Sequence, residues 1–259
     1  METGYSNVEV SFKLLNGIVL VPASVNDEQG YLIFDTGAMK TALNKKHFPD
    51  LQGKELEIAK FNGEMKSDTA AEIAIRSLSF SSITLTDCAA MLMDLAYVED
   101  SLAAFDSSVR LLGTMGIDVI RQFSVMLDYG SSKITLNPFH GLEQSTCVPM
   151  KIEALPVIEI AIDGEPYRFV LDTGANTCLL GAALQGRFPV QPVEGAPNVY
   201  SISSVAVQGR SYTNIVSVFA DISAIQSKVA VDGVIGYHLL SPQRSYFDFA
   251  HQKLYLEDV

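Results

Sequence analysis

The sequence has few basic residues and no long apolar run. Lys and Arg total 18 against 30 Asp and Glu, a formal net charge of -12. The positive surface that a nucleic-acid phosphate backbone requires is therefore missing. No uninterrupted apolar stretch reaches the roughly 18 residues that a membrane-spanning helix needs. We expect neither a nucleic-acid partner nor a membrane span.

Cysteine and histidine are also scarce. Cys88, Cys147 and Cys178 are odd in number and form no C-x-x-C pair, which argues against a disulfide framework and against a zinc site. We expect three buried free thiols. The four histidines are dispersed and lack the close spacing of a metal-binding pair. The sequence predicts no metal site and no cofactor.

Two common enzyme signatures are absent as well. The chain has no G-x-S-x-G pattern and no G-x-x-x-x-G-K-[ST] loop, which disfavours a serine hydrolase and a nucleotide-binding protein. The first residues, METGYSNVEVSF, do not form a signal peptide, because no basic region precedes an apolar one. As it stands the sequence predicts a cytoplasmic protein, and an extracytoplasmic one if a signal peptide has been removed.

An internal repeat dominates what is present. The tetrad Asp-Thr-Gly-Ala occurs at 35–38 and again 137 positions later, each time after an apolar run, YLIF and RFVL. A second block, 77–95, recurs with an offset of 127, and a third, 113–136, recurs with an offset of 120. Three blocks in the same order indicate the duplication of a unit of roughly 100 residues. Two copies suit a pair related by a pseudo-twofold axis, across which corresponding positions can meet.

Each copy is predicted to be β. Apolar and polar residues alternate in GIVLVPASV, VIEIAIDG and SITLTD, while FSVMLDYGSSKITL and SYFDFAHQKLYL are typical of hairpins. Helical signals are sparse, and we expect short helices only at about 117–122, at about 237–241 and within 91–105.

The expected connection between the copies is the segment 137–150, which contains Pro, Gly and polar residues. We therefore predict two domains, a first lobe at 1–143 and a second lobe at 148–259.

The two tetrads place a carboxylate where one is seldom found. Asp followed by Thr-Gly is ordinary turn chemistry, so one copy alone would be a turn more often than a site. Here both copies follow an apolar strand, which carries Asp35 and Asp172 inward. If the two turns face each other, the carboxyl groups share one proton. The ionised group can then take a proton from water while the protonated group donates to a carbonyl oxygen, with no metal or covalent intermediate.

These motifs resemble those of the aspartic proteases, and within them the retropepsin-like branch. The similarity lies in the turns at 33–38 and 170–175 and in the later LLGTMGIDVI and VDGVIGYHLL, which look like the family's hydrophobic-hydrophobic-Gly element. With the strands between them it covers about 12–136 and 149–256. The resemblance implies an all-β chain with two closed, barrel-like acid-protease lobes, related by a pseudo-twofold and containing few short helices.

The resemblance also implies roles for the residues of the turns. It assigns Asp35 and Asp172 to catalysis. It implies that the threonine hydroxyls brace the turns across the junction and that the glycines allow a tight backbone beside the carboxylates. The supporting residues are Thr36, Gly37, Ala38, Thr173, Gly174 and Ala175. Gly116 and Gly236 are expected to pack behind the turns.

The first lobe is longer than the second by ten residues between its tetrad and its second block, the difference between the first two offsets. The extra length falls at 55–72, where Asn62-Gly63 is a two-residue hairpin signal. We interpret this hairpin as a flap over the cleft, with Phe61, Asn62 and Gly63 as candidate substrate contacts. A solvent-facing hairpin without function fits the sequence equally well.

The sequence therefore predicts an aspartic endopeptidase that acts on extended peptides or proteins as a monomer with an intramolecular pseudo-dimer. The alternative is a catalytically inactive peptide-binding module with the same fold, against which the two intact carboxylates argue. Ala38 and Ala175 lack a hydroxyl that could donate to an ionised carboxylate, so we expect a mildly acidic to neutral working pH.

Overall fold

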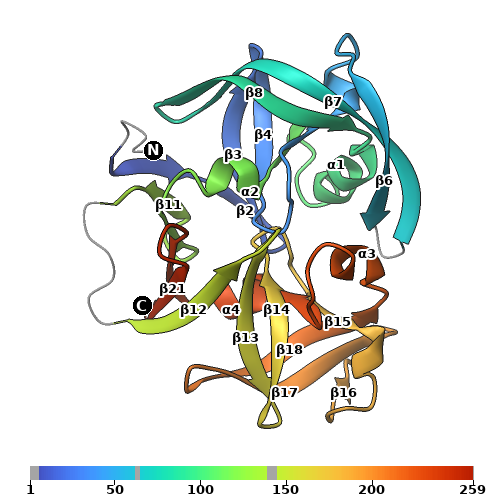
Figure 1. The fold of residues 1–259 in the computed structure, drawn as a ribbon, viewed down its shortest axis with the longest axis vertical. Coiled ribbons are helices and arrows are strands. Elements are labelled where there is room, and N and C mark those ends of the chain that lie inside the picture. The colour runs from blue at the N-terminus through green and yellow to red at the C-terminus, as the bar shows by residue number, and fades with distance from the viewer. Residues whose placement is uncertain (1–5, 62–64, 139–144, 259) are drawn as a thin grey trace.

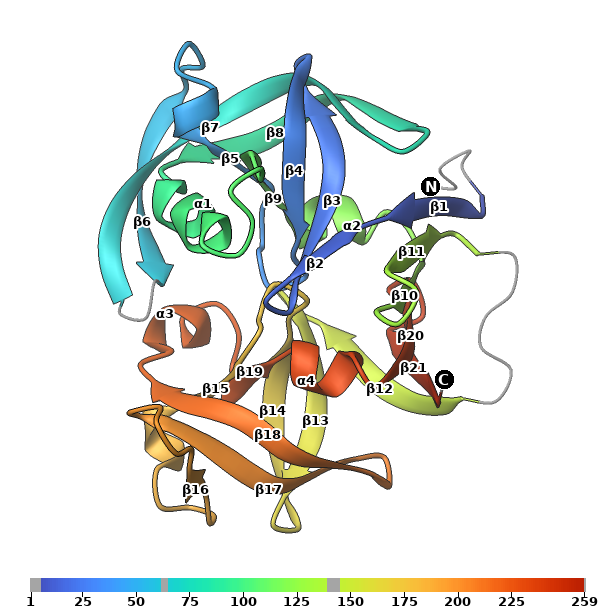
Figure 2. The same ribbon diagram turned by 180° about the vertical axis from the view of Figure 1, so that it is seen from behind.

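The computed structural model describes residues 6–61, 65–138 and 145–258, which form two β lobes joined by a shared sheet (Figure 1 and Figure 2). Strands make up most of the chain, and the helices are short. The predicted fold class is confirmed. Within the described residues no helix is both long and apolar enough to cross a membrane.

The first lobe is a closed ring of strands. Its strands are β2 (Lys13–Leu15), β3 (Ile18–Val25), β4 (Glu28–Phe34), β5 (Ala42–Asn44), β6 (Lys54–Phe61), β7 (Met65–Phe80), β8 (Ile83–Met93) and β9 (Leu111–Met115). The hydrogen-bonded order is β2-β3-β4-β9-β5-β8-β7-β6, and a further pairing of β3 with β7 closes the ring. Long apolar side chains fill the interior because alternate residues of each strand point inward.

The second lobe repeats this ring. Its strands are β13 (Pro156–Ile162), β14 (Glu165–Leu171), β15 (Cys178–Gly181), β16 (Gln191–Pro192), β17 (Val199–Val207), β18 (Arg210–Ala220) and β19 (Gly233–Ile235), with a 3-10 turn at Ala182–Leu184. They follow the order β13-β14-β19-β15-β18-β17-β16, and the pairing of β13 with β17 closes the ring.

A six-stranded antiparallel sheet joins the lobes (Figure 2). It contains β1 (Val8–Ser11), β10 (Val125–Asp128), β11 (Lys133–Leu136), β12 (Thr146–Ile152), β20 (Gln243–Asp248) and β21 (Lys253–Asp258), in the order β1-β11-β10-β20-β21-β12. The two copies meet where β10 pairs with β20, and β12 continues into the ring of the second lobe by pairing with β13. The predicted boundary between 143 and 148 falls partly on residues outside the described range and stays a prediction.

The internal repeat in the sequence is a repeat of structure. β4 and β14 are related by the offset of 137, β8 and β18 by 127, and the short helices α2 (Ile117–Ile120) and α4 (Tyr237–Leu240) by 120. β4 and β14 also share one burial pattern, with exposed first residues and three buried last residues. The buried end of each strand leads directly into its Asp-Thr-Gly-Ala tetrad.

The third predicted helix is α1 (Ala96–Ala103), whose counterpart in the second lobe is the shorter α3 (Ser223–Gln226). Both helices follow an aspartate that accepts a hydrogen bond from the first turn. Asp94 Oδ1 accepts from the Ala96 amide and Asp221 Oδ1 accepts from the Ser223 amide, each at 2.9 Å.

A buried charge cluster fixes α1 to the first lobe. Glu99 is 6% exposed, and its carboxylate contacts His47 Nε2 at 2.8 Å and Lys46 Nζ at 2.9 Å, both from the 3-10 turn Lys45–His47. Burial alone would raise the pKa of Glu99, but the hydrogen bonds from these two basic residues hold that pKa below its ordinary value.

The cysteines depart from expectation. All three are free, but only Cys178 is buried; Cys88 is half-buried and Cys147 is exposed. The prediction is wrong for Cys147 because strand alternation turns it away from the buried Val148 and Met150 of β12.

Candidate active site

Asp35 and Asp172 stand at the ends of two buried strands that point to the junction of the lobes. β4 runs parallel to β9, and the Asp35 amide donates to the Met115 carbonyl at 3.0 Å. In the second lobe β14 runs parallel to β19, and the Asp172 amide donates to the Ile235 carbonyl at 2.9 Å. Each turn is therefore held by its neighbouring strand at the residue that bears the carboxylate.

The two threonines interlock the turns. Thr36 Oγ1 donates to the Leu171 carbonyl at 2.7 Å, and Thr173 Oγ1 donates to the Phe34 carbonyl at 2.6 Å. Each hydroxyl also accepts the backbone amide of the opposite threonine at 3.0 Å. Both side chains are at most 1% exposed. Four buried hydrogen bonds thus fix one turn against the other.

The glycines of the tetrads are required by the opposite carboxylate. A Cβ on Gly37 would overlap the carboxylate of Asp172, and a Cβ on Gly174 would lie 2.7 Å from Asp35 Cγ. Neither glycine has a positive φ, so the turns do not require glycine for its backbone conformation. The reason for glycine is space, because each carboxylate packs directly on the turn of the other lobe.

Backbone amides surround the carboxylates. Asp35 Oδ1 accepts from Gly37 N at 2.9 Å and from Ala38 N at 3.0 Å, and Asp172 Oδ1 accepts from Gly174 N at 2.7 Å. Both side chains remain partly accessible to solvent.

The two carboxyl groups change each other's titration. Burial, and then the charge of the neighbouring Asp172, raise the pKa of Asp35 well above its ordinary value. Burial also raises the pKa of Asp172, while its hydrogen bonds oppose that rise. Two carboxyl groups in this relation titrate as a pair and hold one proton between them.

The helices α2 and α4 support the turns from behind. Tyr237 N donates to the Ala175 carbonyl at 2.9 Å, and Ile117 N donates to the Ala38 carbonyl at 2.8 Å. A Cβ on Gly236 would overlap the Asp172 carbonyl, which explains glycine at that position. Gly116 instead packs against the backbone just beyond the Asp35 turn, where a Cβ would lie 2.5 Å from the Lys40 carbonyl carbon.

Comparison with known proteins agrees with this geometry. Residues 21–119, which include the Asp35 turn and most of α2, match the sequence model of a family described as aspartyl protease. The match covers less than half of the chain and lies in the first lobe, which is thus similar to aspartyl proteases. No curated protein matches the sequence.

The fold of the chain is similar to that of the aspartic proteinase from Irpex lacteus. The TM-score is 0.61, and the match covers 97% of each chain at 12% sequence identity. At this identity the likeness concerns the fold, which in both molecules extends over the two lobes.

The two lobes support their turns differently. In the first lobe Asp118 Oδ1 accepts both the amide and the hydroxyl of Thr41 at 2.9 Å, and Thr41 Oγ1 accepts the Gly116 amide at 3.1 Å. The corresponding residues of the second lobe are Cys178 and His238, and burial lowers the pKa of His238. In the sequence the offset of 120 pairs Asp118 with His238. Thr41 was not among the residues predicted for the site, and its only sequence signal is its fixed distance after the tetrad.

The candidate flap has strands on both sides of its tip. β6 and β7 pair antiparallel from Lys54↔Glu72 to Phe61↔Met65, so the segment predicted at 55–72 is a hairpin. The predicted contacts Asn62 and Gly63 lie outside the described residues, as does the side chain of Phe61. In the second lobe the equivalent β16 has only two residues. A role for the hairpin in covering substrate stays a prediction.

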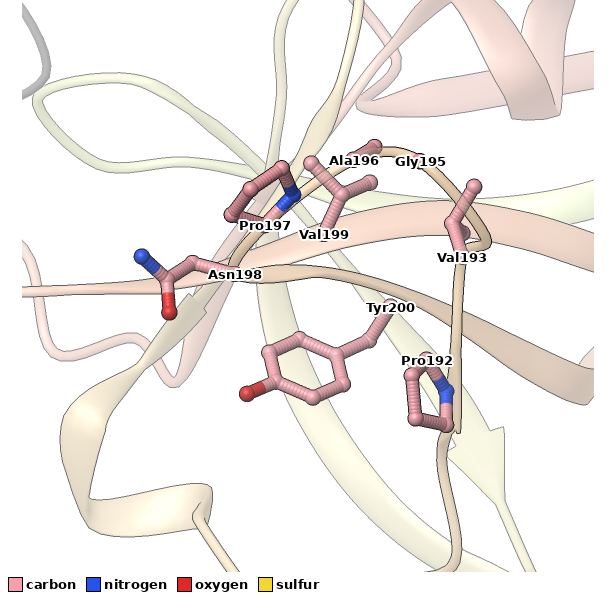
Figure 3. Close-up of a pocket in the computed structure, with 8 residues that line it drawn as sticks. All are labelled: Pro192, Val193, Gly195, Ala196, Pro197, Asn198, Val199 and Tyr200. Atoms are coloured by element: carbon pink, nitrogen blue, oxygen red, sulfur yellow. The ribbon is translucent and has the colours of Figure 1, made fainter.

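A surface hollow of the second lobe does not include the carboxylates. It has a volume of about 420 Å³ and is lined by the loop that links β16 to β17, with the rings of Pro192 and Tyr200 on its wall (Figure 3). This hollow is formed by one local loop of the second lobe, so it does not define the site. The described residues also contain no group of three or more His, Cys, Asp or Glu side chains that could hold a metal ion.

Proposed function

We propose that this protein is an aspartic endopeptidase that hydrolyses peptide bonds with a water molecule activated between Asp35 and Asp172. The observation that supports it most is the coupled pair of carboxyl groups, each packed on the glycine of the opposite turn. The similarity of residues 21–119 to the aspartyl protease family points to peptide substrates.

The proposed mechanism uses the shared proton. The ionised carboxylate takes a proton from the bound water as that water attacks the peptide carbonyl carbon, and the protonated carboxyl donates to the carbonyl oxygen. The tetrahedral intermediate then collapses when one carboxyl group donates its proton to the amine leaving group while the other carboxylate takes a proton from a hydroxyl of the intermediate, so that the pair again holds one proton. Raised pKa values favour this state over a wider pH range, because the second proton is lost only at higher pH.

The interlocked threonines support the same proposal. General acid and general base must both lie within about 3 Å of the reacting groups, which requires that the two turns keep a fixed separation. The four hydrogen bonds between Thr36 and Thr173 and the opposite turns supply that restraint.

The test is cleavage of a denatured protein, with products identified by mass spectrometry between about pH 4 and pH 8. Asp35→Asn and Asp172→Asn keep the shape of the side chain but cannot share a proton, so each should lower kcat at least about a hundredfold. The matched control is Asp163→Asn, because Asp163 is exposed and the first lobe has Asn26 at the equivalent position with the same backbone conformation.

The outcome separates the enzyme from the peptide-binding alternative. A folded wild-type protein that cleaves no peptide bond, while both asparagine variants still bind peptides, would establish the binding module and refute the enzyme. Loss of cleavage in both variants, with wild-type rates for Asp163→Asn, would establish the endopeptidase.

A further inference from the structure

The pseudo-twofold pairs Tyr129 with Phe249. The two residues are 120 positions apart, which is the offset of the third block. Tyr129 follows Asp128, the last residue of β10, and Phe249 follows Asp248, the last residue of β20. Each of these aspartates accepts the backbone amide three residues later, at 3.1 Å and 3.0 Å. The two turns are therefore built alike, and the matched aromatic residues differ by one hydroxyl group.

Tyr129 lies against the helix that supports the Asp172 turn. Its ring packs edge-on against the ring of Tyr237 with centroids 5.4 Å apart, and Phe12 packs on it at 6.0 Å. Tyr237 is the first residue of α4, and its amide holds the carbonyl of Ala175 in the turn. A residue of the first lobe thus packs on the helix that supports the Asp172 turn of the second.

The hydroxyl of Tyr129 has no hydrogen-bond partner among the described residues, although the side chain is only 6% exposed. The other buried polar atoms in this condition are Arg244 Nε and Ser245 Oγ on β20. A buried hydroxyl without a partner costs about 1 to 3 kcal/mol, so its presence at this position needs a reason.

We infer that the Tyr129 hydroxyl makes Asp172 the member of the pair that carries the negative charge, leaving Asp35 as the proton donor. This inference rests on the proposed function. An O–H dipole in a low-dielectric interior stabilises a nearby anion, and a hydroxyl can rotate toward it. On the other side of the axis the corresponding residues are Phe249 and Ile117, which have no such dipole.

The titration of Tyr129 is consistent with this role. Burial raises the pKa of Tyr129, and the charge of Asp172 raises it further, so the phenol stays neutral within the field of that carboxylate.

Other ionisable groups near Tyr129 do not supply the same effect. His238, whose ring lies 5.6 Å from that of Tyr237, stays neutral down to a lower pH than an ordinary histidine because burial lowers its pKa. Asp128 is on the same hairpin and pairs in register with Arg244, whose guanidinium forms an ion pair with Glu257.

The test compares Tyr129→Phe with Ser245→Ala. Both variants remove a buried hydroxyl that lacks a partner, and neither should lower the free energy of unfolding. Only Tyr129→Phe removes the dipole beneath Asp172, so it should move the acidic limb of the kcat/KM profile up by about half to one pH unit. Ser245→Ala should leave that limb in place. Tyr129 is a positioning residue, because it acts through Asp172.

A readout that needs no turnover accompanies the kinetics. The carboxyl carbons of 13C-labelled aspartate are titrated by NMR, with Asp35→Asn and Asp172→Asn used for assignment. Wild-type protein should lose its first proton from Asp172, and Tyr129→Phe should raise the pH of that step by the same amount. The inference would be overturned if Tyr129→Phe shifted the pH of the first deprotonation step no more than Ser245→Ala does. A shift in a protein that cleaves no peptide would uphold the charge assignment and refute the enzyme.

Discussion

Replacing Thr36 with valine tests the interlock between the two lobes. Valine keeps the branched shape and volume of threonine, so the change removes the hydroxyl and little else. Two hydrogen bonds disappear, to the Leu171 carbonyl at 2.7 Å and from the Thr173 amide at 3.0 Å. Both backbone groups are left buried without a partner.

The magnitude follows from these two orphaned groups. Each buried backbone group without a partner costs about 1 to 3 kcal/mol, so Thr36→Val should lower the free energy of unfolding by about 2 to 6 kcal/mol. That is a large part of the roughly 5 to 15 kcal/mol by which a domain is stable. Thr173→Val removes the two mirror-related bonds and should cost about as much.

Urea unfolding followed by circular dichroism measures the effect, since the chain has no tryptophan. The control is Thr213→Val, an exposed threonine on β18 whose replacement should change stability by less than about 0.5 kcal/mol. If Thr36→Val proved no more destabilising than Thr213→Val, the interlock would not hold the lobes together and the reasoning would fail.

Two further predictions concern space and charge. Gly37→Ala places a methyl group on the carboxylate of Asp172 and should lower kcat at least about a hundredfold. The control is Gly130→Ala, whose methyl group meets only a flexible side-chain oxygen at 3.3 Å and should leave kcat unchanged. Equal kcat values for the two variants would contradict the spatial argument. Glu99→Gln should destabilise by about 1 to 2 kcal/mol near pH 7. Because folding depresses the pKa of Glu99, this contribution is present above the unfolded pKa and is lost as pH falls through the folded one. The difference in unfolding free energy should therefore shrink as the pH falls below the unfolded pKa, and a constant difference would refute it.

The repeat made much of the fold predictable. The sequence offset between Asp35 and Asp172 aligns the residues of β4 with those of β14 without a gap. This works because both copies keep the same apolar strand ends and the same turn residues. The short helices followed from the Gly elements at 116 and 236, where the pattern changes from alternation to a compact apolar group. These features are local, and local patterns survive in one sequence.

Features that depend on the other lobe could not be read in this way. The need for glycine at 37 comes from a carboxylate 135 positions away, and the hydroxyl of Tyr129 gains its significance from a helix in the opposite lobe. Cys147 looked like an interior residue because its strand is apolar, but the shared sheet exposes one of its faces. Contacts across the pseudo-twofold are long-range, so no window of sequence contains both partners.

The junction between β10 and β20 has one more consequence. If the two halves were separate chains, their association would depend on protein concentration. Dilution would then dissociate the halves and separate the two carboxylates. A single chain removes this dependence on concentration and also ensures that each first lobe pairs with a second lobe. Each half can then change without its twin changing too, and a tyrosine can stand on one side of the axis while phenylalanine stays on the other.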